Sequence, residues 1–419
     1  MIILYDFFYT IFALIYLPVL IVRGKFHGDF LMRFGKLPSF LKEKTKTGKT
    51  IWIHAVSVGE ILTILKLVAE VKKIWPQHNI ICSTVTTTGY TIAQEKLKDT
   101  AIVIYAPLDW SCVVKKYIRV IKPCLYIAAE TELWPNLYQA LHQSRIPIVI
   151  INGRISDQAF KGYQRFSFLV KNILKKVHCF CMQTDTDAKR IVTLGADTSK
   201  VQVLGNLKFD SVGVEASVKL ESLGFNASDW LFIGGSTHPG EEEVLIEILG
   251  RLQKEFSHLR LVIAPRHIER ASEIIRTIET KGFEAKRFSE LSVRTDNSAK
   301  TIIVVDTIGH LKSLYNLATV VFVGKSLSVK GGQNIIEPAS FGKAILVGPH
   351  MENFKDIMRI FLEAHAIIQV KNREELFREV ENLLRDPQKR NSLGWAAKRV
   401  VEENKGATQR TVEVLKGLL

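Results

Sequence analysis

Cysteine is scarce in this chain and shows no pairing pattern. The 419 residues contain five cysteines, an odd number, and they are scattered. Cys179 and Cys181 have one residue between them, which is not the spacing of a zinc finger. We therefore expect reduced, structural cysteines in a cytoplasmic protein. The cysteines are Cys82, Cys112, Cys124, Cys179 and Cys181.

Several binding signatures are also missing. The chain has neither a Walker A loop nor a GxGxxG motif, so ATP and NAD lose support. It has no short-period repeat, no low-complexity tract and no recognisable RNA or DNA module. Acidic residues are outnumbered, 42 against 57 lysines and arginines, which gives a formal net charge of +15. That charge indicates an anionic partner such as an acidic membrane surface or a phosphorylated ligand, and the missing modules point away from nucleic acid.

One long apolar run stands at the N-terminus. Residues 2–22 carry Asp6 as their only charge, and this length is about that needed to cross a bilayer. No lysine or arginine precedes the run and no small-residue cleavage site follows it, so a cleaved signal peptide fits poorly. Residues 23–49 are strongly basic. We expect an anchor over residues 1–24, spanning a membrane or lying in its interface, with the body of the protein on the cytoplasmic side and its lysines on anionic lipid. A buried N-terminal helix is the alternative.

Strand-like runs alternate with helical patterns along the rest of the chain. This alternation predicts an α/β fold with two Rossmann-like domains, each built on a parallel sheet, facing a cleft. We expect an N-terminal domain over 25–210, a polar linker over 211–229 and a C-terminal domain over 230–395. A helix over 396–419 is expected to pack back towards the N-terminal domain. The expected strands are 51–56, 80–84, 102–105, 125–129, 146–151, 179–183, 201–204, 230–234, 261–264, 283–286, 301–305, 320–323, 344–347 and 367–370.

Residues 160–176 combine lysines and an arginine with apolar residues at helical spacing. The pattern predicts one basic amphipathic helix. Such a helix suits a membrane or a lipid substrate. An ordinary surface helix with a solvated basic face is the alternative.

The segment from His54 to Glu60 places a carboxylate where a strand turns into a helix. Its small residues suit a tight turn, and Glu60 falls in the first helical turn, where the macrodipole favours its ionised form. Open α/β sheets bind ligands at this end of their strands, so Glu60 is a candidate base. The alternative is a helix-capping glutamate.

Two strand ends in the second half carry anion-binding features. Gly234 to Glu241 runs from a strand through small residues into a helix that Pro239 is expected to open, and its free backbone N–H groups can hold phosphate or carboxylate oxygens. Arg266, after Pro265 at the next strand end, suits bidentate capture of a phosphate or carboxylate. A surface arginine is the alternative.

Two later segments suit a nucleotide. Ile308 and Gly309 precede His310 after another strand, and their backbone could line a nucleotide pocket. The segment 330–339 puts a glycine pair before a short helix that carries Glu337. A carboxylate there can accept hydrogen bonds from both ribose hydroxyls, or it can simply begin the helix.

The first half offers three further candidates. Glu130 and Glu132 follow a strand and could tune Glu60 or bind acceptor hydroxyls. Lys208 at the domain junction could neutralise a leaving phosphate. The sequence Asp-Thr-Asp at 185–187 resembles a metal-binding DxD, but it stands just before a helical run, so we interpret it as N-cap chemistry.

Together these residues resemble one family, the 3-deoxy-D-manno-octulosonic acid (Kdo) transferases of lipopolysaccharide synthesis in Gram-negative bacteria. The motifs stand in the family's order across nearly the whole chain. They are HAVSVGE (54–60), ETELWPN (130–136), NGRIS (152–156), GNLKFD (205–210), GGSTHPGEE (234–242), APRH (264–267) and GGQNIIEPA (331–339).

The resemblance implies an inverting glycosyltransferase of the GT-B arrangement that moves Kdo from CMP-Kdo to the lipid A precursor, lipid IVA, and releases CMP. It implies no cofactor and no required metal. Glu60 matches the general base of the family, and Glu130 and Lys208 match its transition-state-stabilising positions. The donor-binding positions are matched by Pro265, Arg266, Ile308, Gly309, His310, Asn334, Ile335, Ile336 and Glu337.

Three departures from the family's pattern concern the donor. The family usually has His where Gln333 stands and Glu where His310 stands, and its loop usually has Pro-Leu where Ile335 and Ile336 stand. The matched acids are intact. Two alternatives stay open: another GT-B glycosyltransferase that uses a different sugar nucleotide on a lipid acceptor, and a membrane-tethered binding protein with a degenerate cleft.

Overall fold

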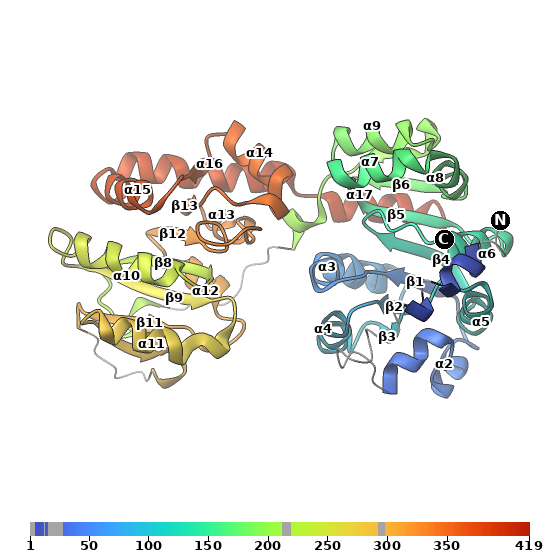
Figure 1. The fold of residues 1–419 in the computed structure, drawn as a ribbon, viewed down its shortest axis with the longest axis horizontal. Helices are drawn as coiled ribbons and strands as arrows, with labels where there is room; N and C mark the ends of the chain where they lie inside the picture. The colour runs from blue at the N-terminus through green and yellow to red at the C-terminus, as the bar shows by residue number, and fades with distance from the viewer. Residues whose placement is uncertain (1–4, 12, 16–27, 212–218, 292–297) are drawn as a thin grey trace. The chain divides into compact units, whose positions relative to one another are not determined.

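The computed structural model describes residues 5–11, 13–15, 28–211, 219–291 and 298–419. Within these residues the chain forms two compact α/β units (Figure 1). One unit comprises residues 1–211 together with 405–419, and the other comprises residues 212–404. Each unit is built on one seven-stranded sheet whose neighbouring strands all pair in parallel. The predicted fold of two Rossmann-like parallel sheets is confirmed.

The first sheet has the strand order β3-β2-β1-β4-β5-β6-β7. Its helices lie on both faces, as the crossover connections of a parallel sheet require (Figure 1). The strands are β1 (Thr50–His54), β2 (Asn79–Thr84), β3 (Ile102–Tyr105), β4 (Pro123–Ala129), β5 (Ile148–Gly153), β6 (Cys179–Met182) and β7 (Val201–Val203). The helices are α2 (Ser39–Lys44), α3 (Val58–Ile74), α4 (Thr87–Leu97), α5 (Ser111–Ile121), α6 (Pro135–Gln143), α7 (Asp157–Arg165), α8 (Ser167–Leu174), α9 (Asp185–Thr193) and α17 (Ala407–Lys416), with 3-10 turns η1 (Gly28–Phe34), η2 (Thr198–Lys200) and η3 (Leu207–Asp210).

The core of the first unit follows from the period of two along its strands. In β1, Ile51 and Ile53 enter the apolar cluster on one face of the sheet, and Trp52 enters the cluster on the other. All three side chains are fully buried, and burying each one contributes roughly 1.5–3 kcal/mol. The chain end adds to the first cluster through Val412 and Leu415 of α17. Burial on both faces explains why these strands read as continuous apolar runs.

The second sheet has the order β10-β11-β9-β8-β12-β13-β14. Its strands are β8 (Trp230–Thr237), β9 (Leu259–Pro265), β10 (Glu284–Arg287), β11 (Thr301–Val304), β12 (Val320–Val323), β13 (Ala344–Val347) and β14 (Ile368–Gln369). Its helices are α10 (Glu241–Leu252), α11 (Ala271–Thr280), α12 (Leu311–Tyr315), α13 (Ile336–Ser340), α14 (Lys355–Glu363), α15 (Arg373–Arg385) and α16 (Pro387–Asn404), with 3-10 turns η4 (Leu220–Leu223), η5 (Ile268–Arg270), η6 (Phe288–Glu290) and η7 (Glu352–Phe354).

Two local expectations change. The predicted single helix over 160–176 is two helices, α7 and α8, because Phe166 leaves helical geometry at φ −114° and ψ 32°. The helix after the Gly234 segment begins at Glu241, since Gly240 before it has a positive φ of 88°.

The Asp-Thr-Asp segment is confirmed as N-cap chemistry: the N-cap is Thr184, whose hydroxyl accepts the backbone N–H of Asp187.

Residues 5–11 and 13–15 are helical. The rest of the predicted anchor over 1–24 lies outside the described residues. Among the residues that the structure describes, no helix is long and apolar enough to cross a bilayer.

Candidate active site

The strand order of the first sheet reverses between β1 and β4. His54, the last residue of β1, pairs with Ala128 near the end of β4. Ligands of open α/β sheets bind at the carboxyl ends of the strands where the order reverses. Glu60 follows β1 and Glu130 follows β4, so the topology brings both predicted carboxylates to this point.

Glu60 is held by the turn that begins α3. The backbone N–H of Val56 donates to Glu60 Oε2 at 2.8 Å, and the hydroxyl of Ser57, the N-cap residue, donates to Oε1 at 2.9 Å. This is a variant of the capping box, so the helix-capping interpretation of Glu60 is geometrically correct. Each carboxylate oxygen keeps a second lone pair, so capping leaves Glu60 able to accept a proton.

Burial sets the basicity of Glu60, whose residue is 9% exposed. Desolvation raises the pKa of this carboxyl, the N–H of Val56 opposes the rise, and the charge of Glu130 adds to it. The helix N-terminus was expected to favour the ionised form, but the cost of burying the charge is larger. A raised pKa makes the carboxylate a stronger base near neutral pH.

Glu130 has an unusual backbone at the end of β4. Its φ is +57°, a left-handed conformation that costs a residue with a side chain roughly 1–3 kcal/mol. Its N–H donates to the carbonyl of Ile151 at 2.9 Å, which keeps the residue attached to β5. A strained residue persists only where the surrounding structure holds it in place, and such residues are common at functional sites.

Lys208 belongs to η3, and β5 positions that turn. Asn152, at the end of β5, accepts the N–H of Leu207 at 3.0 Å with its side-chain oxygen. Burial lowers the pKa of the Lys208 ammonium, the carboxylates of Glu130 and Glu60 raise it, and Arg154 lowers it further. The predicted trio of Glu60, Glu130 and Lys208 therefore shares one electrostatic environment within the first unit.

Two more charged residues act on this trio. Burial raises the pKa of Glu132 to about 7, and the charges of Glu60 and Glu130 add to the rise. Sequence reasoning gave Glu132, together with Glu130, the role of tuning Glu60 or binding acceptor hydroxyls, whereas it named Arg154 only as part of a motif. The available signal for Arg154 was its position directly after β5, the neighbour of β4 in the sheet.

In the second sheet the strand order reverses between β8 and β12. A glycine in β8 allows close packing at this point. A Cβ on Gly235 would lie 2.0 Å from the hydroxyl of Tyr315, so only glycine fits inside β8. The N–H of His238 donates to Glu241 Oε2 at 2.9 Å. The sequence predicted that free N–H groups of this turn would hold an anion; for His238, that anion is the protein's own glutamate.

Glu241 also fixes the loop after β12. Its carboxylate accepts the N–H groups of Lys325, Ser326 and Leu327 at 2.8, 2.9 and 3.0 Å. The side chain is fully buried. Sequence reasoning did not find this role, because the partners are more than 80 residues away along the chain.

Five of the predicted donor residues lie at the end of β9 or after the end of β11. Pro265 ends β9 and is buried, whereas Arg266 is exposed and its N–H donates to the carbonyl of Thr237 at 3.0 Å. Ile308 is 83% exposed, and Gly309 has a φ of +97°. His310 is exposed before α12, with its ring 4.8 Å from that of Phe288.

The segment from Asn334 to Glu337 is organised by its own side chains. Asn334 donates through Nδ2 to Glu337 Oε1 at 3.2 Å and accepts the N–H of Ile336 at 3.1 Å. The side chains of Ile335 and Ile336 are fully buried. These two residues can therefore offer a ligand only their backbone.

Three polar atoms near these strand ends were not predicted as contacts. Thr237 Oγ1, His238 Nε2 and Thr307 Oγ1 are buried, and within the described residues they have no hydrogen-bond partner. Thr237 ends β8, and Thr307 follows β11. Because buried polar atoms normally have partners, these atoms suit a polar ligand.

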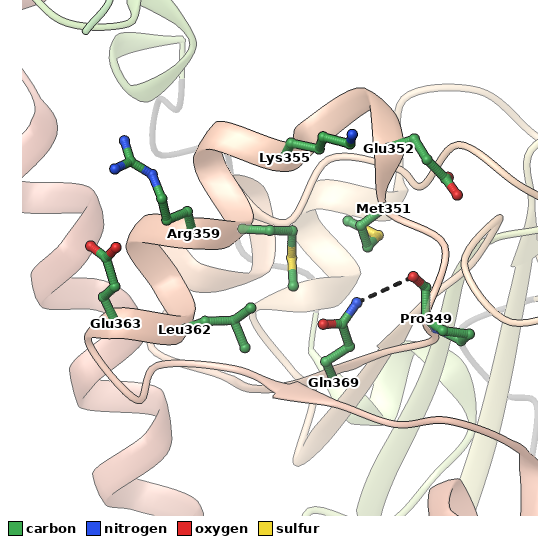
Figure 2. A pocket seen from close by; sticks show the side chains of 9 residues that line it. Pro349, Met351, Glu352, Lys355, Arg359, Leu362, Glu363 and Gln369 are labelled. Carbon is green, nitrogen blue, oxygen red and sulfur yellow. Dashed lines mark hydrogen bonds between the residues drawn. The ribbon is translucent and has the colours of Figure 1, made fainter. Parts of the chain in front are cut away.

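A pocket of about 580 Å³ lies beside α14 (Figure 2). Lys355 and Arg359 of α14 contribute its cations, and Gln369 closes one side by donating to the carbonyl of Pro349 at 3.4 Å. None of the predicted donor residues lines it. It meets the predicted donor segment through Glu352, which accepts the N–H of Gly331, and through Met351, which lies against Gly332. The strand ends therefore remain the better candidate for the reaction.

Comparison with known proteins identifies the family. A family model for 3-deoxy-D-manno-octulosonic-acid transferase (kdotransferase) matches residues 29–211. The 3-deoxy-D-manno-octulosonic acid transferase of Haemophilus influenzae is 32% identical over 373 residues, which are 88% of this chain and 87% of that protein. A bifunctional glycosyltransferase/methyltransferase of Fusobacterium nucleatum is 35% identical over 366 residues, which are 82% of this chain but only 56% of that protein.

The fold has solved counterparts. The UDP-GlcNAc 2-epimerase of Neisseria meningitidis, solved with UDP-GlcNAc, superposes with a TM-score of 0.60 at 13% identity over 88% of this chain and the whole of that chain. At this identity the likeness concerns the GT-B-like fold alone. The sequence relatives are more specific, and they show that the chain belongs to the 3-deoxy-D-manno-octulosonic acid transferase family of glycosyltransferases.

Proposed function

We propose that this family member transfers Kdo from CMP-Kdo to the lipid A precursor, with inversion at the sugar and release of CMP. The observation that carries the proposal is the placement of Glu60 and Glu130 at the reversal of the first sheet, within the electrostatic reach of Lys208. A base, a second acid and a cation are the groups that this displacement needs.

The chemistry follows from these groups. Glu60 takes the proton of an acceptor hydroxyl while the oxygen attacks the anomeric carbon of the sugar. A new glycosidic C–O bond forms, and the bond between the anomeric carbon and the phosphate oxygen of CMP breaks. Lys208 and Glu130 stabilise the charges that develop in the transition state. The hydrogen bonds from Val56 and Ser57 hold Glu60 in place, so little ordering is needed at the moment of reaction.

The second unit supplies suitable groups for a nucleotide with one phosphate. Arg266 is exposed at the end of β9 and can pair with a phosphate. Glu337, at the start of α13, can accept hydrogen bonds from the ribose hydroxyls. The unpartnered hydroxyls of Thr237 and Thr307 would complete a polar lining for the donor.

We also propose that the protein works on the cytoplasmic face of the inner membrane, with the segment 1–24 as its anchor. Phe166, Phe168 and Leu169 at the junction of α7 and α8 are 64%, 76% and 46% exposed. The same helices carry basic residues, among them Lys161 and Lys171. Exposed aromatic residues beside lysines suit an anionic bilayer interface.

A transfer assay tests the proposed reaction. The full-length protein is mixed with CMP-Kdo, generated in place because it is labile, and with the tetraacylated lipid A precursor, and mass spectrometry counts the sugars added. We expect one or more Kdo additions. A folded protein that adds no Kdo, beside a relative that does so in parallel, would contradict the proposal.

The donor can be tested independently of the acceptor. We expect CMP to raise the melting temperature of the protein more than UDP does, because CMP is the nucleotide part of the proposed donor and a ligand that binds the folded state stabilises it. Protection by UDP alone would favour a different sugar nucleotide on the same fold.

A further inference from the structure

One carboxylate, that of Asp6, makes three of the hydrogen bonds that join the described part of the N-terminal helix to the rest of the first unit. Asp6 Oδ1 accepts the backbone N–H of Ser111 at 3.1 Å and the side-chain Nδ2–H of Asn136 at 2.6 Å. Asp6 Oδ2 accepts the hydroxyl of Ser111 at 2.5 Å. Ser111 begins α5 and Asn136 lies in the first turn of α6, so a single side chain joins three helices.

The N-termini of α5 and α6 need hydrogen-bond acceptors from outside the two helices. The N-cap residues of α5 and α6 are Trp110 and Trp134, and neither side chain caps its helix. The first N–H groups of a helix have no partner within it, and an anionic acceptor there is stabilising. Asp6 supplies this acceptor to α5. Asp109 supplies it to α6, where it accepts the N–H groups of Asn136 and Leu137 at 3.0 and 2.9 Å.

Asn136 connects this cap to the candidate catalytic acids. Its Nδ2 donates both to Asp6 and to the carbonyl of Asp109, the latter at 2.6 Å. It ends the segment 130–136, which begins with the strained Glu130 and contains Glu132. The hydroxyl of Tyr138 in α6 donates to the carbonyl of Glu132 at 2.7 Å. The N-terminal helix is therefore hydrogen-bonded to the end of the segment that carries two acids of the site.

The helix has two different faces. On the docked face, the hydroxyl of Tyr9 accepts the N–H of Asp109, and Thr10 accepts the indole N–H of Trp110 at 3.0 Å. Other side chains of the helix are exposed and apolar: Phe7 58%, Phe8 60%, Leu14 68% and Ile15 70%. Asp6, Tyr9 and Thr10 make these hydrogen bonds, so the bonds can be removed without changing the exposed apolar residues.

We infer that Asp6 is a positioning residue for the transfer reaction. By joining the N-terminal helix to the start of α6, it holds the segment 130–136 in the geometry that places Glu130 and Glu132 beside Glu60. The inference rests on the proposed function for its kinetic consequence, whereas its structural consequence can be measured without any substrate.

Hydrogen exchange of the full-length protein tests the structural step. In Asp6→Ala we expect faster amide exchange in peptides that cover 109–116 and 130–138, with peptides of the second unit unchanged. Asp99→Ala, at an exposed aspartate of the same unit, is the matched control and should exchange like the native protein. Unchanged exchange around residues 130–138 in Asp6→Ala would overturn the inference, whether or not the protein transfers Kdo.

Steady-state kinetics of Kdo transfer, with the acceptor dissolved in detergent, test whether Asp6 affects the reaction. We expect Asp6→Ala to lower kcat about tenfold and to leave KM for CMP-Kdo unchanged, because small displacements of catalytic groups slow chemistry. Asp6→Asn keeps one acceptor oxygen and should recover part of the loss. Asp6→Ala in an Asn136→Ala background should cause no further loss, since the connection is already broken. A native kcat in folded Asp6→Ala, or losses that multiply in the double variant, would overturn the positioning role.

Discussion

The backbone N–H of Val56 donates to Glu60 Oε2 at 2.8 Å, so the carboxylate is fixed to the strand end that precedes it. One side chain thus caps α3 and, in the proposed reaction, also serves as the base. The two roles agree, because capping orients the carboxylate while burial raises its pKa.

Glu60→Gln should separate these roles. The amide keeps the size of the side chain and one acceptor oxygen, so the fold should remain, but glutamine cannot take a proton. We expect Kdo transfer to fall at least about a hundredfold, as for the loss of a general base, with little change in melting temperature. Glu95→Gln, at an exposed glutamate of α4, is the control. Near-normal transfer by Glu60→Gln would refute the base assignment.

Lys208→Ala should lower the rate of the chemical step. Lys208 is half-buried and its ammonium interacts with Glu130 and Glu60, so its removal takes away positive charge where the proposed reaction develops charge. We expect a loss of about 10²–10³ in single-turnover rate. Lys189→Ala on α9 is the matched control. If single-turnover transfer by Lys208→Ala proceeds at the native rate, Lys208 has no catalytic role.

Glu132 should make stability fall as pH rises. Its pKa is about 7 in the folded protein against an ordinary value of 4.5, so the folded state binds the proton more tightly than the unfolded state. The stabilisation is complete below about pH 4.5 and is lost as pH rises through about 7. We expect the native protein to lose about 2 kcal/mol more than Glu132→Gln between pH 5 and pH 8, measured by urea denaturation. Parallel pH profiles of the two proteins would contradict the raised pKa.

Asp210 should hold the C-terminal helix on the first unit. Its carboxylate accepts the N–H groups of Gly406 and Thr408 at 2.6 and 2.5 Å, at the start of α17. We expect Asp210→Ala to lose about 2–4 kcal/mol, because two hydrogen bonds to a buried charge disappear. Trypsin should then cleave after Lys405 earlier than in the native protein or in Asp99→Ala. Native resistance to trypsin would show that α17 is held by its apolar contacts alone.

Phe166 and Phe168 should contribute to binding of anionic vesicles. Replacing both by serine removes two exposed apolar side chains, and we expect vesicle affinity to fall about tenfold or more. Sedimentation with phosphatidylglycerol vesicles measures the change. Trp395→Ser, at a 69% exposed tryptophan of α16, is the control and should bind like the native protein. An equal loss in both variants would show that exposed aromatics in general cause the binding.

The sequence alone indicated the 14 strands of the two sheets, because most of them are buried on both faces, are therefore continuous apolar runs, and alternate with helical patterns. The charged strand β10 is an exception. The sequence also placed Glu60 in the first turn of α3, since small residues and an N-cap serine are local signals. It marked Glu130 and Lys208 as candidates from their places after a strand and at the domain junction, but it did not show that they lie near Glu60, because nothing local shows which strand ends are neighbours.

Tertiary structure alone decided which groups act on each other. The reversal between β1 and β4 brings Glu60 and Glu130 together, and burial then raises the pKa of Glu60 despite the helix N-terminus. Glu241 accepts the N–H of His238, which the sequence left for a ligand, and it also accepts N–H groups from a loop more than 80 residues away. Asp6, which the sequence shows as one charge in an apolar run, caps a helix that begins 105 residues later. Burial and long-range hydrogen bonds depend on the whole fold, so no local pattern could have shown them.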